Sequence, residues 1–330
     1  MNVLLIGGTG LLGNNVLECL LERGHRVRVA ARNAKRIAVD IRRYEDRCKI
    51  EIANIADKED LMRLAKGSDA IVNCAGETDM SLGKLEDYYP MNRDLCGNLI
   101  AVAKEIGLEA IVHVSTANTI GYGTRGRESD ETEEMKAPFD KSKYATSKRE
   151  GEEILLERGK KCGIRVVIVN PGYIIGKYDQ KPTSGKMIDL GWKKRVMIAP
   201  KGGKSFVSAK TVAEAVVGGM ERGRDGERYL ATGENMTFKQ FYELVAKVGR
   251  YKQKIVELPK WFLRTVGRMG DVLRVLGIRS SVSSNNVEQL LIEEHYSSKK
   301  AERELGIRQQ TIEEAIRDYV EYRKGITTAR

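Results

Sequence analysis

Histidine and cysteine are scarce in this 330-residue chain, which holds three histidines and five cysteines. The cysteines lie far apart, at positions 19, 48, 74, 96 and 162, and no C-x-x-C pair occurs. Because a structural zinc site needs Cys or His ligands at short, paired spacings, we expect no metal centre. An odd number of dispersed cysteines favours reduced thiols in a cytoplasmic protein over a disulfide framework.

Long apolar runs and clustered charges are also missing. The apolar segment 2–6 is too short to span a bilayer and follows no basic signal region, so we expect a cytoplasmic protein. The formal net charge of +11 favours anionic partners such as phosphorylated cofactors. Because no run of five basic residues occurs, we do not expect nucleic acid as a partner.

Short apolar segments alternate with stretches of helical periodicity in the first half of the chain. This alternation predicts an α/β fold with a parallel, doubly wound sheet and helices on both faces. The second half is less regular and predicts a smaller α/β substrate domain, so we divide the chain into residues 1–176 and 177–330, with 205–232 expected to pack back on the first domain. The predicted strands are 2–6, 27–29, 50–52, 70–73, 110–114 and 165–169, the predicted helices include 11–23, 92–106 and 142–160, and capping boxes are predicted at Thr237/Gln240 and Thr311/Glu314.

A glycine-rich turn separates the first predicted strand from the first predicted helix. Its glycines satisfy the pattern G-x-G-x-x-G, which lets a pyrophosphate approach backbone amides at a helix N-terminus. Because the motif follows a strand and opens an amphipathic helix, it predicts a dinucleotide site. The predicted contacts in this turn are Gly7, Thr9, Gly10, Leu11, Leu12 and Gly13.

The residue after the second predicted strand distinguishes the two nicotinamide dinucleotides. NAD sites usually have an acidic residue there that binds the ribose 2′-hydroxyl. This chain has Arg32 instead, followed by Lys35 and Arg36. Because a guanidinium group can pair with a 2′-phosphate, the sequence favours NADP(H) as the cofactor, with NAD(H) as the alternative.

Tyr144 and Lys148 form a Y-x-x-x-K motif on a predicted helix. A spacing of four places both side chains on one helix face. A free tyrosine has a pKa of about 10, and an ammonium group about 4 Å away is worth roughly 4 kcal/mol at an effective dielectric of about 20. The pair therefore predicts that Lys148 lowers the pKa of Tyr144 by about three and makes it a proton donor and acceptor near neutral pH.

Several motifs occur in the order typical of one enzyme family. After the glycine turn come Asn73-Cys74-Ala75-Gly76, Ser115-Thr116, the Tyr144/Lys148 pair and Asn170-Pro171-Gly172. This order resembles the extended short-chain dehydrogenase/reductase family, also called the NAD-dependent epimerase/dehydratase family. The resemblance extends over nearly the whole chain, is most specific over residues 1–176, and points to the dihydroflavonol-reductase-like and 3β-hydroxysteroid-dehydrogenase-like branch with its Rossmann domain.

The resemblance implies roles for the matching positions. Thr116, with Ser115 as its rival, would hydrogen-bond the reacting oxygen. Tyr144 would be the general acid/base, Lys148 would hold the nicotinamide ribose, and Asn92 would order the site. Further cofactor contacts are implied at Asn54, Ile55, Ala75, Gly76, Pro171 and Ile174, although the family usually has aspartate where Asn54 stands.

The same family includes oxidoreductases, epimerases and dehydratases. Dehydratases usually carry Thr-Asp-Glu where this chain has Thr116-Ala117-Asn118, so water elimination is not expected. Epimerases usually have an arginine where this chain has Lys204, although Lys204 and the lysines of 177–186 could still hold phosphates. We therefore expect an NADP(H)-dependent oxidoreductase of a secondary alcohol or ketone, with a nucleotide-sugar epimerase as the alternative. A non-catalytic NADP-sensing protein is less well supported, because such relatives usually lack the Tyr/Lys pair.

Segment 259–280 alternates apolar residues such as Trp261 and Phe262 with arginines at helical spacing. Three interpretations remain open: a helix packed on the substrate domain, a wall of an apolar substrate pocket, or a basic amphipathic helix on a membrane surface. Family members are often homodimers through helices that correspond to 92–106 and 142–160, so a homodimer is a further expectation.

Overall fold

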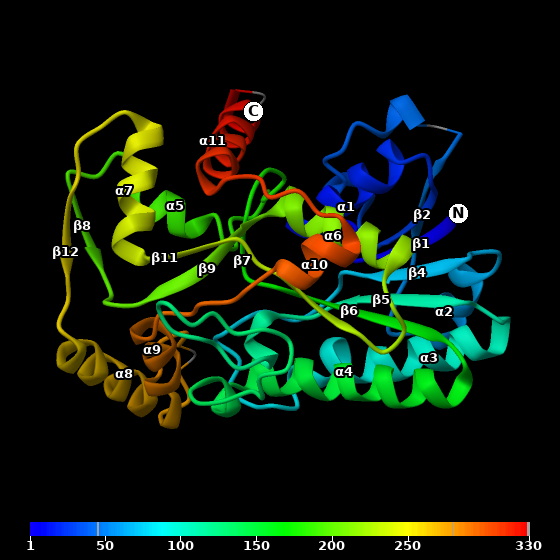
Figure 1. The fold of residues 1–330 in the computed structure, drawn as a ribbon, viewed down its shortest axis with the longest axis horizontal. Coiled ribbons are helices and arrows are strands. Elements are labelled where there is room, and N and C mark those ends of the chain that lie inside the picture. The colour runs from blue at the N-terminus through cyan, green and yellow to red at the C-terminus, as the bar shows by residue number, and fades with distance from the viewer. Residues whose placement is uncertain (45, 279, 329–330) are drawn as a thin grey trace.

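A seven-stranded, wholly parallel sheet forms the centre of the molecule (Figure 1). The computed structural model describes residues 1–44, 46–278 and 280–328. The strand order is β10-β6-β5-β4-β1-β2-β3. This order confirms the predicted doubly wound fold, because the first six strands follow the arrangement of a Rossmann domain. The strands are β1 (Asn2–Ile6), β2 (Arg26–Ala31), β3 (Cys48–Ile52), β4 (Ala70–Asn73), β5 (Ala110–Val114), β6 (Arg165–Pro171) and β10 (Arg228–Ala231).

Helices cover both faces of this sheet, and successive residues of each strand supply the two cores. In β1, Val3 and Leu5 belong to one apolar cluster, whereas Leu4 and Ile6 belong to the other. The alternation follows from the two-residue period of a strand, and it explains why buried parallel strands appear in the sequence as continuous apolar runs. One face carries α1 (Leu11–Glu22) and α6 (Ala209–Arg222), and the other carries α2 (Lys58–Ala65), α3 (Leu95–Ile106) and α4 (Lys143–Cys162) (Figure 1).

The predicted helix 92–106 begins later than expected. Residues Pro90–Asp94 form a π-helical turn, and α3 starts at Leu95. The amide of Leu95 donates to the carbonyl oxygen of Pro90, five residues back, which widens the turn. The predicted helix 142–160 is confirmed as α4, whose N-terminus is capped by the hydroxyl of Ser142.

The second half of the chain contributes to both parts of the molecule. The strand β10 pairs with β6, and α6 packs on the first sheet, so part of the segment 205–232 belongs to the first region. The remainder forms a second, smaller α/β region around the sheet β11-β9-β7 and the strand pair β12-β8. Its strands are β7 (Tyr173–Ile175), β8 (Val196–Ala199), β9 (Gly203–Ser208), β11 (Glu234–Thr237) and β12 (Lys254–Glu257), and the helices of this half besides α6 are α5 (Lys186–Gly191), α7 (Phe238–Gly249), α8 (Lys260–Val275), α9 (Ser284–Leu291), α10 (Lys299–Leu305) and α11 (Ile312–Thr328).

Aromatic packing and helix caps stabilise the second region. The rings of Phe206 and Phe241 stack with their centroids 4.4 Å apart, in a core shared by β9, α7 and α11. Both predicted capping boxes are confirmed: Thr237 and Gln240 bond reciprocally, and Thr311 pairs with Glu314 in the same way. In the described ranges, no helix has both the length and the apolar content that crossing a bilayer requires.

Candidate active site

The glycine turn between β1 and α1 brings two backbone segments into very close contact. Gly7 has a φ of +79°, a conformation that side chains other than glycine rarely adopt. A Cβ atom on Gly13 would lie 2.0 Å from the carbonyl oxygen of Gly7. Gly10 is the N-cap of α1 and provides no side-chain cap, so the first amides of α1 are available to an anion. The turn therefore fits the pyrophosphate of a dinucleotide.

The glycine turn also lies against the end of β4. A Cβ atom on Gly7 would lie 2.6 Å from the amide nitrogen of Ala75. A Cβ atom on Gly76 would lie 3.2 Å from Asn92 Oδ1 and 3.6 Å from Lys148 Nζ. The structure thus places the predicted catalytic lysine one residue away from the segment that contacts the dinucleotide turn.

Asn92 connects this segment to helix α4. Its Oδ1 accepts the amide hydrogen of Glu77 at 2.8 Å, and its Nδ2 donates to the carbonyl oxygen of Glu77 at 3.0 Å. Nδ2 also lies 2.9 Å from the hydroxyl of Ser147, which neighbours Lys148 on α4. Asn92 lies in the π-helical turn and links the segment after β4 to α4 through these contacts.

Thr116 and Tyr144 come together at the carboxyl end of β5. Thr116 is the second residue after the strand, caps the short turn Ala117–Thr119, and forms a hydrogen bond with Tyr144. The hydroxyl of the rival residue, Ser115, is buried and has no hydrogen-bond partner among the described residues. This geometry favours Thr116 over Ser115 as the partner of Tyr144.

The expectation that Lys148 lowers the pKa of Tyr144 is wrong for this arrangement. Burial raises the pKa of Tyr144 to about 12, and the hydrogen bond with Thr116 opposes the rise only partly. The Nζ atom of Lys148 is directed elsewhere, 2.7 Å from the carbonyl oxygen of Val114 and 3.2 Å from His113 Nε2. Tyr144 is therefore a neutral phenol at neutral pH.

His113 is a partner of Lys148 that the sequence analysis missed. It is fully buried on β5, in register with Asn73 on β4, and its Nδ1 lies 3.0 Å from Asn73 Nδ2. Asn73 Oδ1 accepts the amide hydrogen of Ala75, which turns the Nδ2 donor toward the ring. Because Nδ1 faces the Asn73 amide group, a neutral His113 carries its proton on Nε2, next to Lys148 Nζ. Burial lowers the pKa of both Lys148 and His113.

The sequence analysis also missed Glu152, whose carboxylate contacts the carboxyl end of β6. Its carboxylate is buried and accepts from Asn170 at 2.8 Å, Thr119 at 2.7 Å and Arg228 at 2.8 Å. Glu152 follows Lys148 by four residues on α4, and this helical spacing is a signal that could have revealed it. The contacts fix Asn170 and hence the position of Pro171, which follows it in the chain.

Most of the remaining predicted cofactor residues lie at carboxyl ends of strands. Arg32 follows β2 and is exposed. Asn54 follows β3, and its Oδ1 accepts the amide hydrogen of Ala56 in a local turn, while Ile55 packs on the sheet. Pro171 ends β6, and Ile174 is a half-buried residue of β7. Arg32, Asn54 and Pro171 therefore share the sheet edge where doubly wound folds bind ligands, whereas Ile174 lies in the middle of β7, in the second sheet.

Two cations that could have held a substrate diphosphate are already paired. The ammonium group of Lys204 forms an ion pair with the buried carboxylate of Glu294. Lys177 lies 2.7 Å from Glu18 on α1. These contacts weaken the argument for an epimerase, because the charges of Lys204 and Lys177 are compensated within the protein.

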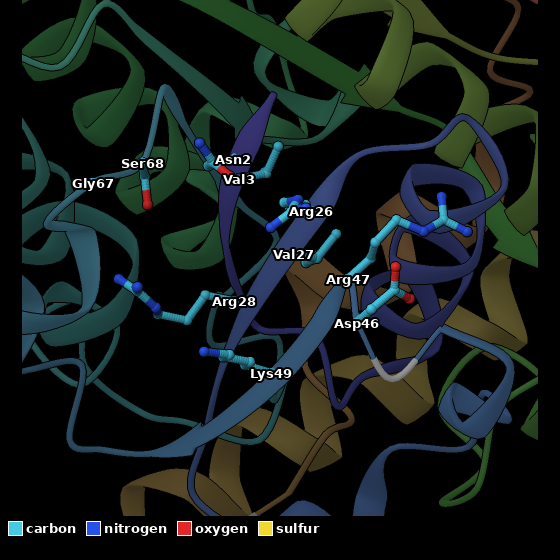
Figure 2. A pocket seen from close by; sticks show the side chains of 10 residues that line it. All are labelled: Asn2, Val3, Arg26, Val27, Arg28, Asp46, Arg47, Lys49, Gly67 and Ser68. Atoms are coloured by element: carbon cyan, nitrogen blue, oxygen red, sulfur yellow. The ribbon is translucent and has the colours of Figure 1, made fainter.

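A separate basic hollow lies at the opposite edge of the sheet (Figure 2). Its volume is about 140 Å³, and Arg26, Arg28, Arg47 and Lys49 line it together with Asp46. It borders the amino ends of β1 and β2, whereas the glycine turn follows the carboxyl end of β1. The hollow is therefore not the dinucleotide site.

Comparisons with known proteins agree with this geometry. Residues 3–230 match the NAD dependent epimerase/dehydratase family. The chain is 27% identical to a putative dihydroflavonol 4-reductase of Synechocystis over 96% of its own length and 92% of the relative's. It is 25% identical to sterol demethylase protein B of Methylococcus capsulatus, over 83% and 82% of the two chains.

Solved structures share the fold over the full length of the chain. The crystal structure of gox2253 superposes with a TM-score of 0.82 at 26% identity and covers 98% of both chains. UDP-glucose 4-epimerase of Thermotoga maritima superposes with a TM-score of 0.76 at 18% identity, over 99% of this chain and 100% of the epimerase. The similarity to the epimerase concerns the fold alone.

Proposed function

Because the chain belongs to the NAD dependent epimerase/dehydratase family of nicotinamide-dependent enzymes, we propose that it is an NADP(H)-dependent oxidoreductase acting on a secondary alcohol or ketone. The observation that carries the proposal is the hydrogen bond between Thr116 and Tyr144 next to Lys148. Lys148 is in turn 3.6 Å from the position of a Cβ on Gly76, beside the dinucleotide turn. The proximity of these side chains to the glycine turn supports the proposal.

The side chains of this site suit the reduction of a ketone. A reduced nicotinamide dinucleotide, when bound at the glycine turn, would supply the hydride for this chemistry. Tyr144 donates its phenolic proton to the carbonyl oxygen, and Thr116 hydrogen-bonds the same oxygen and holds it in place. Burial keeps Tyr144 protonated at neutral pH, which is the state that a general acid needs. Lys148 would hold the nicotinamide ribose, and Asn92 would keep the neighbouring loop and α4 aligned.

Preference for NADP(H) rests on Arg32. Its guanidinium group is exposed directly after β2, where an acidic residue would repel a 2′-phosphate. The nearby Lys35 and Arg36 are also exposed and add positive charge. The glycine turn that contains Gly7 and Gly13 fits the pyrophosphate of the same dinucleotide.

A bulky apolar ketone is the substrate class that the observations favour. The pairing of Lys204 with Glu294 removes a cation that a nucleotide sugar would need. Relatives carry the names putative dihydroflavonol 4-reductase, 3-beta-hydroxysteroid dehydrogenase and a farnesyl-substituted dihydroquinoline-oxide ketoreductase, and each name refers to a substrate with a ring system. A nucleotide-sugar epimerase is the second candidate, because UDP-glucose 4-epimerase of Vibrio cholerae is 28% identical over 53% of this chain.

The test is a substrate panel with the purified full-length chain. Ketones on flavonoid and steroid skeletons are incubated with NADPH, and UDP-sugars are incubated with NAD, while the absorbance of reduced nicotinamide is followed. Ketone-dependent loss of absorbance is expected. Interconversion of a UDP-sugar without net change in absorbance would replace the oxidoreductase by the epimerase.

Replacing the proposed acid separates turnover from binding. We expect Tyr144→Phe to abolish ketone reduction while NADPH binding, measured by fluorescence titration, stays near the wild-type value. The matched control is Tyr89→Phe, because Tyr89 contacts Arg93 outside the catalytic group. Substantial residual turnover in Tyr144→Phe would reject Tyr144 as the proton donor, and full turnover is required of the control.

A further inference from the structure

Helix α8 packs on the neighbouring part of the molecule through the face that carries its glycines. Gly267 and Gly270 are its buried residues among those described. A Cβ atom on Gly267 would lie 3.0 Å from Ser284 Cα, and one on Gly270 would lie 2.3 Å from the carbonyl oxygen of Val282. The helix therefore packs on α9 and the segment before it through its small residues. An amphipathic helix of a globular protein usually buries its large apolar side chains instead.

The large apolar side chains of α8 and the segment after it face outward. Their exposed fractions reach 68% at Trp261, 64% at Met269 and 86% at Val275. We call this set the α8 surface; its members are Trp261, Phe262, Met269, Val272, Leu273, Val275, Leu276, Ile278 and Val282. Contiguous apolar exposure of this kind marks an interaction site. The strands β8 and β12, whose exposed residues include Val196, Ile198 and Val256, lie at the same end of the molecule as α8 (Figure 1).

Positive charge accompanies the α8 surface. Lys260 and Arg268 are exposed on the helix itself, whereas Arg264 is paired with Glu288. Within α8 the acidic side chain is Asp271, which accepts the amide hydrogen of Ser284 and so caps α9. The free charge on the helix is therefore positive.

More cations stand at the start of the neighbouring strands. Lys193, Lys194 and Arg195 directly precede β8 and are exposed. Lys252 precedes β12, and Lys254 is its first residue; both are exposed. Apolar side chains and these cations thus share this end of the molecule, together with the exposed carboxylate of Glu257 on β12.

We propose that the α8 surface docks the protein on an anionic lipid bilayer, with α8 lying in the plane of the interface. Aromatic and aliphatic side chains enter the boundary between headgroups and acyl chains, and the cations contact anionic headgroups. A second copy of the chain fits less well, because a two-fold contact through α8 would bring the cations of both helices together. The charge complementarity therefore favours a bilayer over self-association.

The α8 surface is connected to the candidate active site through one loop. Arg274 of α8 donates to the carbonyl oxygen of Met80 at 2.9 Å. In the same loop, the carbonyl oxygen of Asp79 accepts from the hydroxyl of Tyr88 at 2.6 Å, and the Tyr88 ring lies 6.3 Å from that of Tyr144. If the proposed function is correct, a docked enzyme would take its apolar ketone from the bilayer beside this loop.

Vesicle flotation with the full-length chain tests the docking. One set of vesicles is phosphatidylcholine alone, and the other contains equal parts of phosphatidylcholine and phosphatidylserine. We expect the protein to float with the anionic vesicles at low salt and to be released by high salt. Absence from both floating fractions would overturn the proposal. The assay needs no turnover, so it can succeed or fail independently of the oxidoreductase assignment.

Variants of exposed residues localise the contact. The double substitution Trp261→Ser/Val275→Ser should abolish flotation without changing the melting temperature, because both side chains are mostly exposed. Ile52→Ser is the matched control, since Ile52 is 61% exposed on β3, away from α8. Equal flotation of the double variant and the control would overturn the proposal. A dimer in light scattering that the double variant dissociates would also overturn it, in favour of a second copy.

Discussion

Among single residues, Arg32 governs the predicted preference for NADPH over NADH. The substitution Arg32→Asp replaces a cation by an anion at the end of β2. We expect the Kd for NADPH to rise by at least about tenfold, because a charge-assisted hydrogen bond is lost and repulsion is introduced. The Kd for NADH should change little or fall. Fluorescence titration with both dinucleotides measures the two constants.

The control for Arg32 makes the same change of charge at a neighbouring site. Arg43 is also exposed in the segment between β2 and β3. If Arg43→Asp weakens NADPH as much as Arg32→Asp does, the effect is a general loss of positive field, and Arg32 has no specific contact with the 2′-phosphate.

His113 is a buried residue that contacts the ammonium-bearing end of Lys148. The substitution His113→Phe removes the contacts to Lys148 Nζ and Asn73 Nδ2. We expect the Kd for NADPH to rise about tenfold, since Lys148 loses a buried partner. The pH profile of ketone reduction should also shift, and a residue that only fills space would leave that profile unchanged. His25→Gln is the control. His25 directly precedes β2, at the amino ends of the strands, and pairs with Glu221.

Among the structural elements, the junction of β1 and α1 has no room for an added side chain at Gly13. The substitution Gly13→Ala would place a Cβ 2.0 Å from the carbonyl oxygen of Gly7 and 2.7 Å from Gly8 Cα. We expect a loss of about 1–3 kcal/mol in the free energy of unfolding and a loss of NADPH binding, because α1 must move away from the turn. Urea unfolding and NADPH titration measure both. Gly83→Ala should change neither, since nothing lies within 4 Å of its Cβ position; equal effects of the two substitutions would contradict the prediction.

The sequence predicts the elements of the first sheet well because the physical signal is local. Buried parallel strands are apolar on both faces, so β1, β4 and β5 stand out as short apolar runs between helices. The π-helical turn Pro90–Asp94 was missed because its amide pattern depends on how Asn92 contacts the loop and α4. No periodicity in the residues themselves distinguishes it from ordinary helix.

The sequence predicts which residues form the site, but it does not predict how their side chains contact one another. Motif order identifies Thr116, Tyr144 and Lys148 as candidates. The partner of Lys148 depends on the register between β4 and β5, which brings His113 opposite Asn73. Pairs such as Lys204 and Glu294, 90 residues apart, likewise form only when distant elements pack. Sequence reasoning therefore assigns residue types to a site without giving their protonation states.

For the molecule as a whole, buried tyrosines predict a sharp loss of stability at alkaline pH. Burial raises the pKa of Tyr88, Tyr144 and Tyr242 to about 12 each. In the unfolded chain these phenols ionise at about pH 10. Their contribution is therefore complete below about pH 10 and is lost as the pH rises from about 10 to about 12, where the unfolded state releases protons that the folded state retains.

Thermal unfolding followed by circular dichroism at constant ionic strength tests this dependence. The melting temperature should be nearly constant around neutral pH and begin to fall above about pH 8.5, because burial also raises the pKa of Cys19, Cys74 and Cys96. It should fall more steeply above about pH 10, where the phenols of the unfolded chain ionise as well. Each buried phenol adds about 1.4 kcal/mol per pH unit to the slope of the unfolding free energy in that window. Tyr242→Phe should lessen the slope, because one titrating group is removed from the core that α7 shares with β9 and α11. A melting temperature that stays level up to about pH 12 would show that these phenols ionise as readily in the folded protein as in the unfolded chain.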